Sequence, residues 1–252
     1  MRFDEYLVKN GFFESRTKAK QAIEKGEVLL NGIEILKSAK EITEGSQYEI
    51  KIISAQSFVS IGGYKLQKAL KDFDFNVQDL IVADIGASTG GFTDCLIKNG
   101  AKKVYAVDLN DELLHSSLKA NGKVVSVIKN AKNLKKEDVD GITLITADLS
   151  FISAKQVLSV FYDLLPDSGK LILLIKPQFE MDKKRVFKNG IVKDEKARNE
   201  AVRAVYNVAL EVGFCALKMT TAPIDKNKNI EFLILLSKDK AESRGFDLLY
   251  KI

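Results

Sequence analysis

Beyond residue 60, seven apolar runs constrain the fold of this chain more than any other feature of its sequence. Stretches with helical periodicity fill most of the gaps between the runs. Because strands joined by crossover helices form a mainly parallel, right-handed sheet, the pattern predicts an α/β, Rossmann-like fold with seven strands. A short turn between the last two runs makes the final strand antiparallel. The predicted strands are residues 80–84, 103–108, 124–128, 142–148, 170–176, 214–220 and 230–237.

The composition is that of an ordinary globular protein, and it excludes several kinds of site. Of the 252 residues, 46% are hydrophobic and 29% are charged, as in many soluble proteins. No run approaches the ~18 apolar residues of a membrane helix, and the early acids at the N-terminus do not fit a secretory signal. Two cysteines far apart and a single histidine leave no disulfide framework and no zinc spacing. We therefore expect a reduced, cytoplasmic setting, with no metal and no stable membrane association.

The first 53 residues have the pattern of a separate, small α/β domain. One short helix starts at Phe3, and a second follows a capping serine and ends at a glycine. An Asn31-Gly32 turn between two apolar stretches predicts a hairpin, and residues 48–52 add a closing strand. The expected parts are the small domain (1–53), a polar linker (54–60), a large domain (61–238) and a C-terminal tail (239–252) that either docks or stays mobile.

Basic residues cluster in the second helix of the small domain. Residues 1–60 hold nine basic and nine acidic residues, so charge alone favours a solvated helix face balanced by Glu14 and Glu24. However, the spacing R-x-D-x-x-L followed by S-R-x-x-A-x-x-x-I-x-x-G-x-V-x-x-N-G resembles the RNA-binding domain of small-subunit ribosomal protein S4. This resemblance implies contacts to RNA phosphates, which give affinity rather than sequence readout. The expected RNA contacts are Arg2, Arg16, Lys18, Lys20 and Lys25.

A glycine-rich turn, D-I-G-A-S-T-G-G-F-T-D, follows the first predicted strand of the large domain. Small residues let the backbone bend sharply and approach a ligand, and an acid at the end of the next strand can accept hydrogen bonds from ribose hydroxyls. A tight turn can use glycine without any ligand, but the flanking strand and helix favour a nucleotide-like cofactor. The spacing fits neither a dinucleotide fingerprint nor a phosphate loop. The expected cofactor residues are Asp84, Gly86, Ala87, Ser88, Thr89, Gly90, Gly91, Phe92, Thr93 and Asp108.

Four charged residues are predicted at the sheet edge where ligands bind in this fold class. Asp148 and Lys176 each end a strand, Glu231 begins the antiparallel last strand, and Lys65 follows a Gly-Gly turn that leads into a helix. The alternative is that each charge simply meets water at the end of its strand. Two lysines and two carboxylates at one edge instead suggest group transfer to a weakly acidic hydroxyl, which needs a base or a nearby positive charge.

The motifs around these residues resemble those of FtsJ-like 2′-O-methyltransferases. D-x-G-x-x-x-G-G-F-T is similar to their S-adenosylmethionine turn, and Lys-Asp-Lys-Glu is their catalytic set. The resemblance implies S-adenosylmethionine as cofactor, Lys176 as base or alkoxide stabiliser, and Asp148 as the residue that orients it. Lys65 and Glu231 would hold the ribose and tune Lys176.

Residues 1 to about 237 resemble the TlyA (haemolysin A) family of ribosomal RNA cytidine 2′-O-methyltransferases. The resemblance implies ribosomal RNA as partner, with 23S RNA expected ahead of 16S RNA. Ile61 replaces an arginine of the family, residues 109–112 depart from its adenosine-side pattern, and Asn130 is carried over as a cofactor neighbour. The shared motifs are S-x-G-G-x-K-L at 60–66, D-L-S-F-I-S at 148–153, K-P-Q-F-E at 176–180 and N-x-E-F at 229–232.

The sequence leaves alternatives open on two points, the role of a basic run and the class of function. Lys183, Lys184 and Arg185, expected near the crevice, either contact RNA phosphates or form a solvated loop. The chain could also be a non-catalytic RNA-binding or ribosome-assembly factor, although the intact Lys-Asp-Lys-Glu set argues against that. A membrane-active haemolysin is a third reading, which no amphipathic membrane helix or secretion signal supports.

Overall fold

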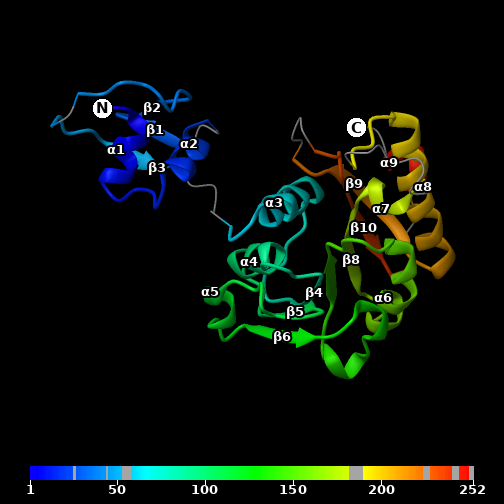
Figure 1. Cartoon of the computed structure of the whole chain (residues 1–252). Helices are drawn as coiled ribbons and strands as arrows, with labels where there is room; N and C mark the ends of the chain where they lie inside the picture. The colour runs from blue at the N-terminus through cyan, green and yellow to red at the C-terminus, as the bar shows by residue number, and fades with distance from the viewer. Residues whose placement is uncertain are drawn as a thin grey trace. The chain divides into compact units, whose positions relative to one another are not determined.

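A computed structural model shows two units, Met1–Ser57 and Phe58–Ile252, each with its own core (Figure 1). The division falls inside the segment expected to be a linker. The described residues are 1–24, 27–43, 45–52, 58–181, 190–223, 228–239 and 244–249.

The N-terminal unit packs two helices against a small antiparallel sheet of order β2-β1-β3. Asn31 and Gly32 both have positive φ, 52° and 76°, as a two-residue type I′ hairpin requires. The predicted hairpin is therefore confirmed, and β3 adds the expected closing strand beside β1. The elements are α1 (Phe3–Lys9), α2 (Arg16–Glu24), β1 (Val28–Leu30), β2 (Ile33–Glu34) and β3 (Ile50–Ile52).

The second unit contains the predicted seven-stranded sheet, in the order β6-β5-β4-β7-β8-β10-β9. β10 runs antiparallel to both of its neighbours and the other pairings are parallel, which confirms the predicted topology. Every predicted strand is present, with ends shifted by at most two residues. The strands are β4 (Ile81–Ile85), β5 (Lys103–Asp108), β6 (Val124–Ile128), β7 (Leu144–Ala147), β8 (Lys170–Ile175), β9 (Cys215–Thr221) and β10 (Phe232–Ser237).

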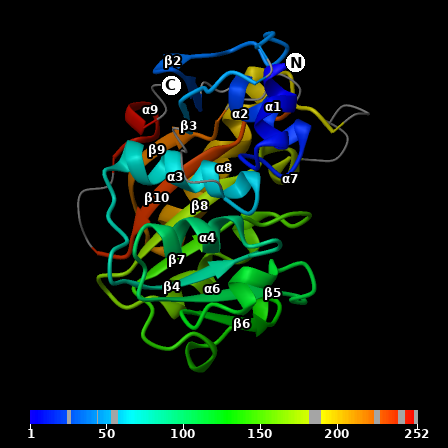
Figure 2. The ribbon, with the colours of Figure 1, turned by 90° about the vertical axis from the view of Figure 1, so that its left-hand side faces the viewer.

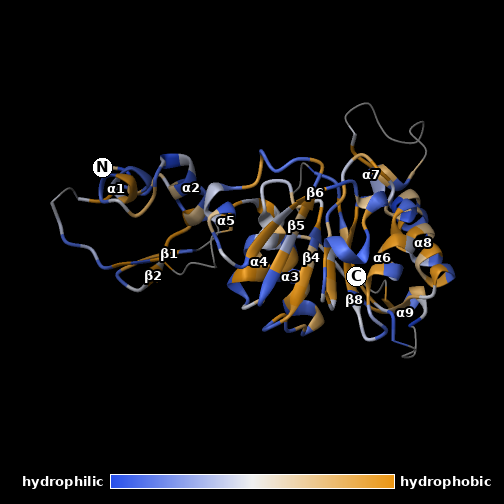
Figure 3. Ribbon diagram, turned by 90° about the horizontal axis from the view of Figure 1, so that it is seen from below, coloured by the Kyte–Doolittle hydropathy of each residue, from blue (hydrophilic) through white to orange (hydrophobic). Residues whose placement is uncertain are grey.

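Helices cover both faces of this sheet. α3 (Ile61–Phe73) and α4 (Gly91–Lys98) lie on one face, whereas α6 (Leu158–Leu164) and α8 (Glu195–Val212) lie on the other (Figure 2). Successive strand residues alternate between the two cores, as a pleated strand requires; Leu171 and Leu173 pack with α6 and α8, whereas Ile172 and Leu174 pack with α3 and α4. Hydrophobic residues accordingly gather on the strands and on the helix faces turned toward them (Figure 3).

Short helices complete the unit, and residues 244–249 of the tail dock on its body. In α9, Phe246 and Leu249 are buried, and the Phe246 ring stands edge-on to Tyr206, with ring centroids 5.3 Å apart. The Tyr206 hydroxyl donates to the Arg244 carbonyl oxygen at 3.0 Å. None of the helices in the described ranges is long and apolar enough to cross a membrane. The short helices are α5 (Ser116–Lys119), α7 (Pro177–Glu180), α9 (Phe246–Leu249) and the 3₁₀ turns η1 (Ala131–Asn133), η2 (Lys136–Asp138) and η3 (Ala154–Gln156).

Candidate active site

The glycine-rich turn after β4 bends through three left-handed residues. Gly86, Ser88 and Gly90 have φ of 84°, 49° and 91°. The backbone N–H groups of Gly86 and Ala87 both donate to the Val107 carbonyl oxygen, at 2.9 and 3.1 Å. A Cβ atom on Gly86 would lie 2.5 Å from the Asp148 carbonyl oxygen, so only glycine fits there. The turn therefore passes directly against the ends of β5 and β7.

Asp84, the first residue of the motif, is buried and stabilises the turn through hydrogen bonds. Its side chain accepts hydrogen bonds from the hydroxyls of Thr93 at 2.6 Å and Thr146 at 3.0 Å, and the residue has no exposed surface. Burial is the main cause that raises the pKa of its carboxyl to about 7; the charge of Asp148 contributes in the same direction, and the hydrogen bonds from Thr93 and Thr146 oppose it. Asp84 therefore contributes to the site through its charge and through the conformation of the turn, because its oxygens do not reach the surface.

Two other predicted cofactor residues also face inward. The Phe92 side chain is buried in the core between the sheet and α3, and Thr93 is fully buried against Asp84. The side chains of these residues thus build the start of α4, and only their backbone is available to a ligand. Their presence in the motif is explained by packing.

Asp108 ends β5 at the open side of the turn. Its carboxylate accepts the backbone N–H groups of Ser88 and Leu109, both at 2.7 Å, which fixes the orientation of both oxygens. The Lys129 N–H donates to the Asp108 carbonyl oxygen at 2.8 Å, so neighbouring Asn130, whose side chain caps η1, is held close to it. A close-approach glycine, a fixed half-exposed acid and a buried carboxylate suit a nucleoside that carries a positive charge.

The four predicted site residues form two ion pairs. Lys176 Nζ lies 2.5 Å from Asp148 Oδ1, and Lys65 Nζ lies 2.5 Å from Glu231 Oε2. The Lys176 side chain is 10% exposed, and those of Lys65 and Glu231 are 17% and 14% exposed. All four groups are therefore mostly shielded from water, which strengthens their interactions relative to surface pairs.

Strand pairing brings the two ion pairs to one place. Ile175 of β8 is paired with Phe232 of β10, and continuing this antiparallel register sets Lys176 opposite Glu231. Asp148 in turn donates its backbone N–H to Ile85 at 3.0 Å, immediately before the glycine-rich turn. The structure thus brings together residues that are up to 166 positions apart, at the edge of the sheet where the turn lies.

Three further hydrogen bonds, not singled out from the sequence, lie at or near Lys176. The Lys176 ammonium also donates to the Ser150 hydroxyl at 2.8 Å. Buried Glu180 accepts from the Ser153 hydroxyl at 2.5 Å and from the Ala154 N–H at 2.7 Å, and burial raises the pKa of its carboxyl. K-P-Q-F-E is thereby joined to D-L-S-F-I-S, and the motifs themselves were the signal that these residues belong to the site.

An exposed aromatic ring, that of Phe151, lies next to the Phe179 ring, which in turn lies near Lys176. Phe151 is 89% exposed and has a φ of +68°, a strained conformation for a residue with a bulky side chain. Its ring centroid is 5.4 Å from that of Phe179, and the Phe179 centroid is 5.9 Å from Lys176 Nζ. Such a ring can stack on an unpaired nucleobase. The sequence alone carries no signal for this role, because a local pattern does not show whether a phenylalanine is buried or exposed.

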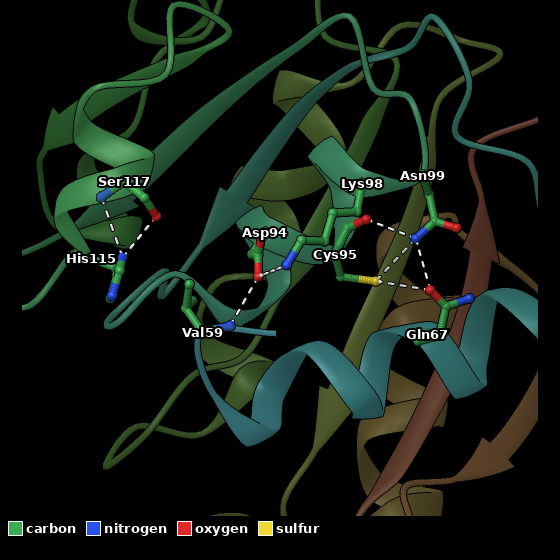
Figure 4. A network of polar contacts seen from close by, with 8 residues as sticks. All are labelled: Val59, Gln67, Asp94, Cys95, Lys98, Asn99, His115 and Ser117. Atoms are coloured by element: carbon green, nitrogen blue, oxygen red, sulfur yellow. Dashed lines mark hydrogen bonds and ion pairs between the residues drawn. The ribbon is translucent and has the colours of Figure 1, made fainter. Parts of the chain in front are cut away.

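A polar network fixes α3, which carries Lys65, to α4 at the turn (Figure 4). Asp94 accepts from the Val59 N–H at 2.9 Å and from Lys98 Nζ at 2.8 Å, and Asn99 donates to the Gln67 side chain at 2.8 Å. The first residues of the large unit are therefore tied to the helix that follows the turn. The His115 side chain caps α5 by accepting from the Ser117 N–H, and its backbone N–H donates to the Thr89 carbonyl oxygen of the turn at 3.3 Å. Ile61 is 58% exposed.

The predicted RNA contacts of the N-terminal unit lie on its surface, and each described one has an acidic partner. Arg2 pairs with Asp4, Arg16 pairs with Asp4 and Glu5, Lys18 pairs with Glu14, and Lys20 pairs with Glu24. Lys25, Lys183, Lys184 and Arg185 lie outside the described residues.

Comparison with known families identifies both units. Residues 58–238 match the FtsJ-like methyltransferase family, and residues 1–47 match the S4 domain. The chain belongs to the FtsJ-like methyltransferase family. Its cofactor is S-adenosylmethionine, and the turn, Asp84 and Asp108 fit that charged nucleoside as described above.

Individual relatives match this methyltransferase over nearly its whole length, and they confirm the expected TlyA (haemolysin A) relationship. Hemolysin A of Brachyspira hyodysenteriae is 39% identical, with 92% of this chain and 98% of the relative covered. The 16S/23S rRNA (cytidine-2′-O)-methyltransferase TlyA of Mycobacterium tuberculosis is 34% identical (93% and 89% covered), and the 23S rRNA (cytidine-2′-O)-methyltransferase TlyA of Campylobacter jejuni is 32% identical (95% and 100% covered). The solved structure of a candidate hemolysin from Streptococcus thermophilus has a TM-score of 0.72 at 34% identity, covering 99% of this chain and 94% of that one.

Proposed function

We propose that this enzyme methylates the 2′-hydroxyl of a cytidine ribose in ribosomal RNA, with 23S RNA as its principal target. The observation that carries the proposal is the pair of shielded ion pairs, Lys176–Asp148 and Lys65–Glu231, at the edge that holds the cofactor turn. The substrate is supported by the two TlyA relatives, whose names share 23S rRNA and differ in 16S rRNA.

Lys176 is the group best placed to activate the hydroxyl. A ribose hydroxyl is a poor nucleophile at neutral pH, so it needs a base or a cation beside the oxygen as the proton leaves. When bound, S-adenosylmethionine supplies an electrophilic methyl group on its sulfonium. Asp148 and Ser150 hold the Lys176 amine in one position, from which it stabilises the developing alkoxide or accepts its proton. No metal is needed, because there is no phosphate or carbonyl to activate.

The second ion pair positions the substrate. Glu231 lies across the strand pair from Lys176 and is held by Lys65. A carboxylate there can accept a hydrogen bond from the ribose, and the Lys65 ammonium holds that carboxylate in position. Holding the hydroxyl in line with the methyl group accounts for a large part of the rate in a direct displacement.

RNA binding is assigned to the S4 domain and to Phe151. The S4 domain presents Arg2, Arg16, Lys18 and Lys20 to the phosphate backbone, which gives affinity without sequence readout. Phe151 supplies a ring on which the target base stacks after it leaves its helix.

Mapping 2′-O-methyl groups on 23S and 16S RNA tests this function. Ribosomal subunits from cells that lack the gene are incubated with the purified protein and S-adenosylmethionine, and both RNAs are read for protected ribose positions. We expect a new 2′-O-methylcytidine in 23S RNA. Methylation of 16S RNA alone would correct the target, and methyl groups on a base, or none in either RNA, would refute the proposal.

A further inference from the structure

Four charged side chains form one connected cluster in the N-terminal unit. Arg2 donates to both oxygens of Asp4, from Nε at 3.0 Å and from Nη2 at 2.9 Å. Arg16 places Nη2 3.5 Å from Asp4 Oδ2 and Nη1 2.9 Å from Glu5 Oε1. Asp4 is only 2% exposed, whereas the arginine side chains are 41% and 54% exposed. A buried carboxylate thus anchors two exposed guanidinium groups.

Both arginines contact the same carboxylate oxygen of Asp4. The Nη2 atoms of Arg2 and Arg16 both approach Asp4 Oδ2, so their guanidinium groups are held side by side. A guanidinium has five N–H donors in a planar fork, and the contacts to Asp4 and Glu5 use only part of each fork. Because both side chains are partly exposed, an acceptor from solvent can approach the remaining donors.

We propose that Asp4 organises Arg2 and Arg16 into one binding site for a phosphate of the RNA backbone. This inference rests on the proposed RNA substrate, and it adds a residue of opposite charge as an essential part of the RNA-binding surface. Long, exposed side chains lose rotamer freedom when they bind. Because Asp4 already restrains both arginines, little further rotamer entropy is lost when a phosphate binds them. The phosphate oxygens then accept charge-assisted hydrogen bonds of matched geometry from the two guanidinium groups.

Glu5 contacts the same arginine but has a different role. It is 39% exposed and bonds only one of the two guanidinium groups, so it restrains Arg16 weakly and competes with phosphate. Arg2, by contrast, holds the pKa of Asp4 below its ordinary value, which keeps the anchor ionised at neutral pH. Removing one negative charge at Asp4 or at Glu5 therefore changes net charge equally, but only the change at Asp4 is expected to weaken RNA binding.

The test compares Asp4→Asn with Glu5→Gln in the full-length protein. Affinity for a 23S RNA transcript is measured by filter binding at fixed salt, and affinity for S-adenosylmethionine is measured alongside. We expect Asp4→Asn to weaken RNA binding by about tenfold, Glu5→Gln to leave it unchanged or tighten it, and neither to alter cofactor affinity. Tighter RNA binding by Asp4→Asn would overturn the inference, because Asp4 would then act only as a competing charge.

A charge-conserving variant covers the case in which Asp4→Asn unfolds the small unit. Arg16→Lys keeps the charge and leaves Asp4 in place but removes the planar fork. We expect it to weaken RNA binding several-fold, and wild-type affinity in this variant would overturn the inference. If the wild-type protein itself binds no ribosomal RNA, the proposed function fails, and this site fails with it. Normal wild-type binding with equal effects in the two charge-removing variants refutes only the organised site.

Discussion

At the scale of single residues, Asp84 has the most unusual environment in the site. With a folded-state pKa of about 7 and an ordinary unfolded value near 4, the folded protein binds a proton that the unfolded chain has lost between these pH values. The free energy of unfolding should therefore fall as pH rises from about 4 to about 7, by an amount on the order of a few kcal/mol, and level off above. Urea unfolding of the wild type and Asp84→Asn across this range measures the effect. We expect the variant to lose this part of the pH dependence, and parallel curves for the two proteins would contradict the role of Asp84.

Phe151 offers a second prediction at this scale. If a target base stacks on its ring, Phe151→Ala should raise KM for RNA by about tenfold, because base–aromatic stacking contributes about 1–3 kcal/mol. Phe151→Tyr keeps an aromatic face and serves as the matched control. Steady-state kinetics with RNA, together with cofactor titrations, separate the two substrates. An alanine variant with wild-type KM would remove Phe151 from the RNA-binding surface.

At the residue level, the sequence pattern indicates which charged groups to consider but does not assign their contacts. Asp148, Lys176 and Glu231 could be selected because each adjoins an apolar run at a predicted strand end, and Lys65 because it follows a Gly-Gly turn that leads into a helix. Which lysine meets which acid depends on strand order and register, and a local sequence pattern does not contain these. A local pattern also does not show which way a side chain of the turn points: Phe92 stays a predicted cofactor neighbour through its backbone, while its side chain packs in the core.

At the scale of elements, the glycine-rich turn should tolerate no side chain where it crosses β7. Gly86→Ala requires a left-handed alanine, which costs about 1–2 kcal/mol, and places Cβ 2.5 Å from the Asp148 carbonyl oxygen. We expect lower stability and at least a tenfold loss of S-adenosylmethionine affinity, measured by calorimetry. Gly122→Ala is the matched control, since no atom lies within 4 Å of its added Cβ. Unchanged cofactor affinity in Gly86→Ala would show that the turn is not the binding element.

Long elements were predictable from sequence and short ones were not. The strands have continuous apolar runs and α3 has clear helical spacing, so their positions follow from burial alone. α7 is four residues long, too short for any periodicity, and Pro177 at its start reads equally well as the end of a strand. The docking of α9 depends on a contact with Tyr206, some 40 positions away, which a local pattern cannot specify.

At the scale of the whole molecule, the two units have separate cores. A fragment of residues 58–252 retains the sheet, both of its cores and the Asp94–Val59 hydrogen bond at 2.9 Å. We expect this fragment to unfold cooperatively and to bind S-adenosylmethionine like the full chain, but to bind ribosomal RNA at least tenfold more weakly. Thermal unfolding and two binding titrations check this. Full RNA affinity in the fragment would place RNA recognition in the large unit instead.

The most direct measurement of the central claim is single-turnover methyl transfer from labelled S-adenosylmethionine to ribosomal RNA, with the wild type and Lys176→Met. The account predicts labelled 2′-O-methylcytidine with the wild type, and a rate at least about 100-fold lower in the variant with cofactor affinity retained. Equal rates in the two proteins, or label on a base rather than a ribose, would contradict it.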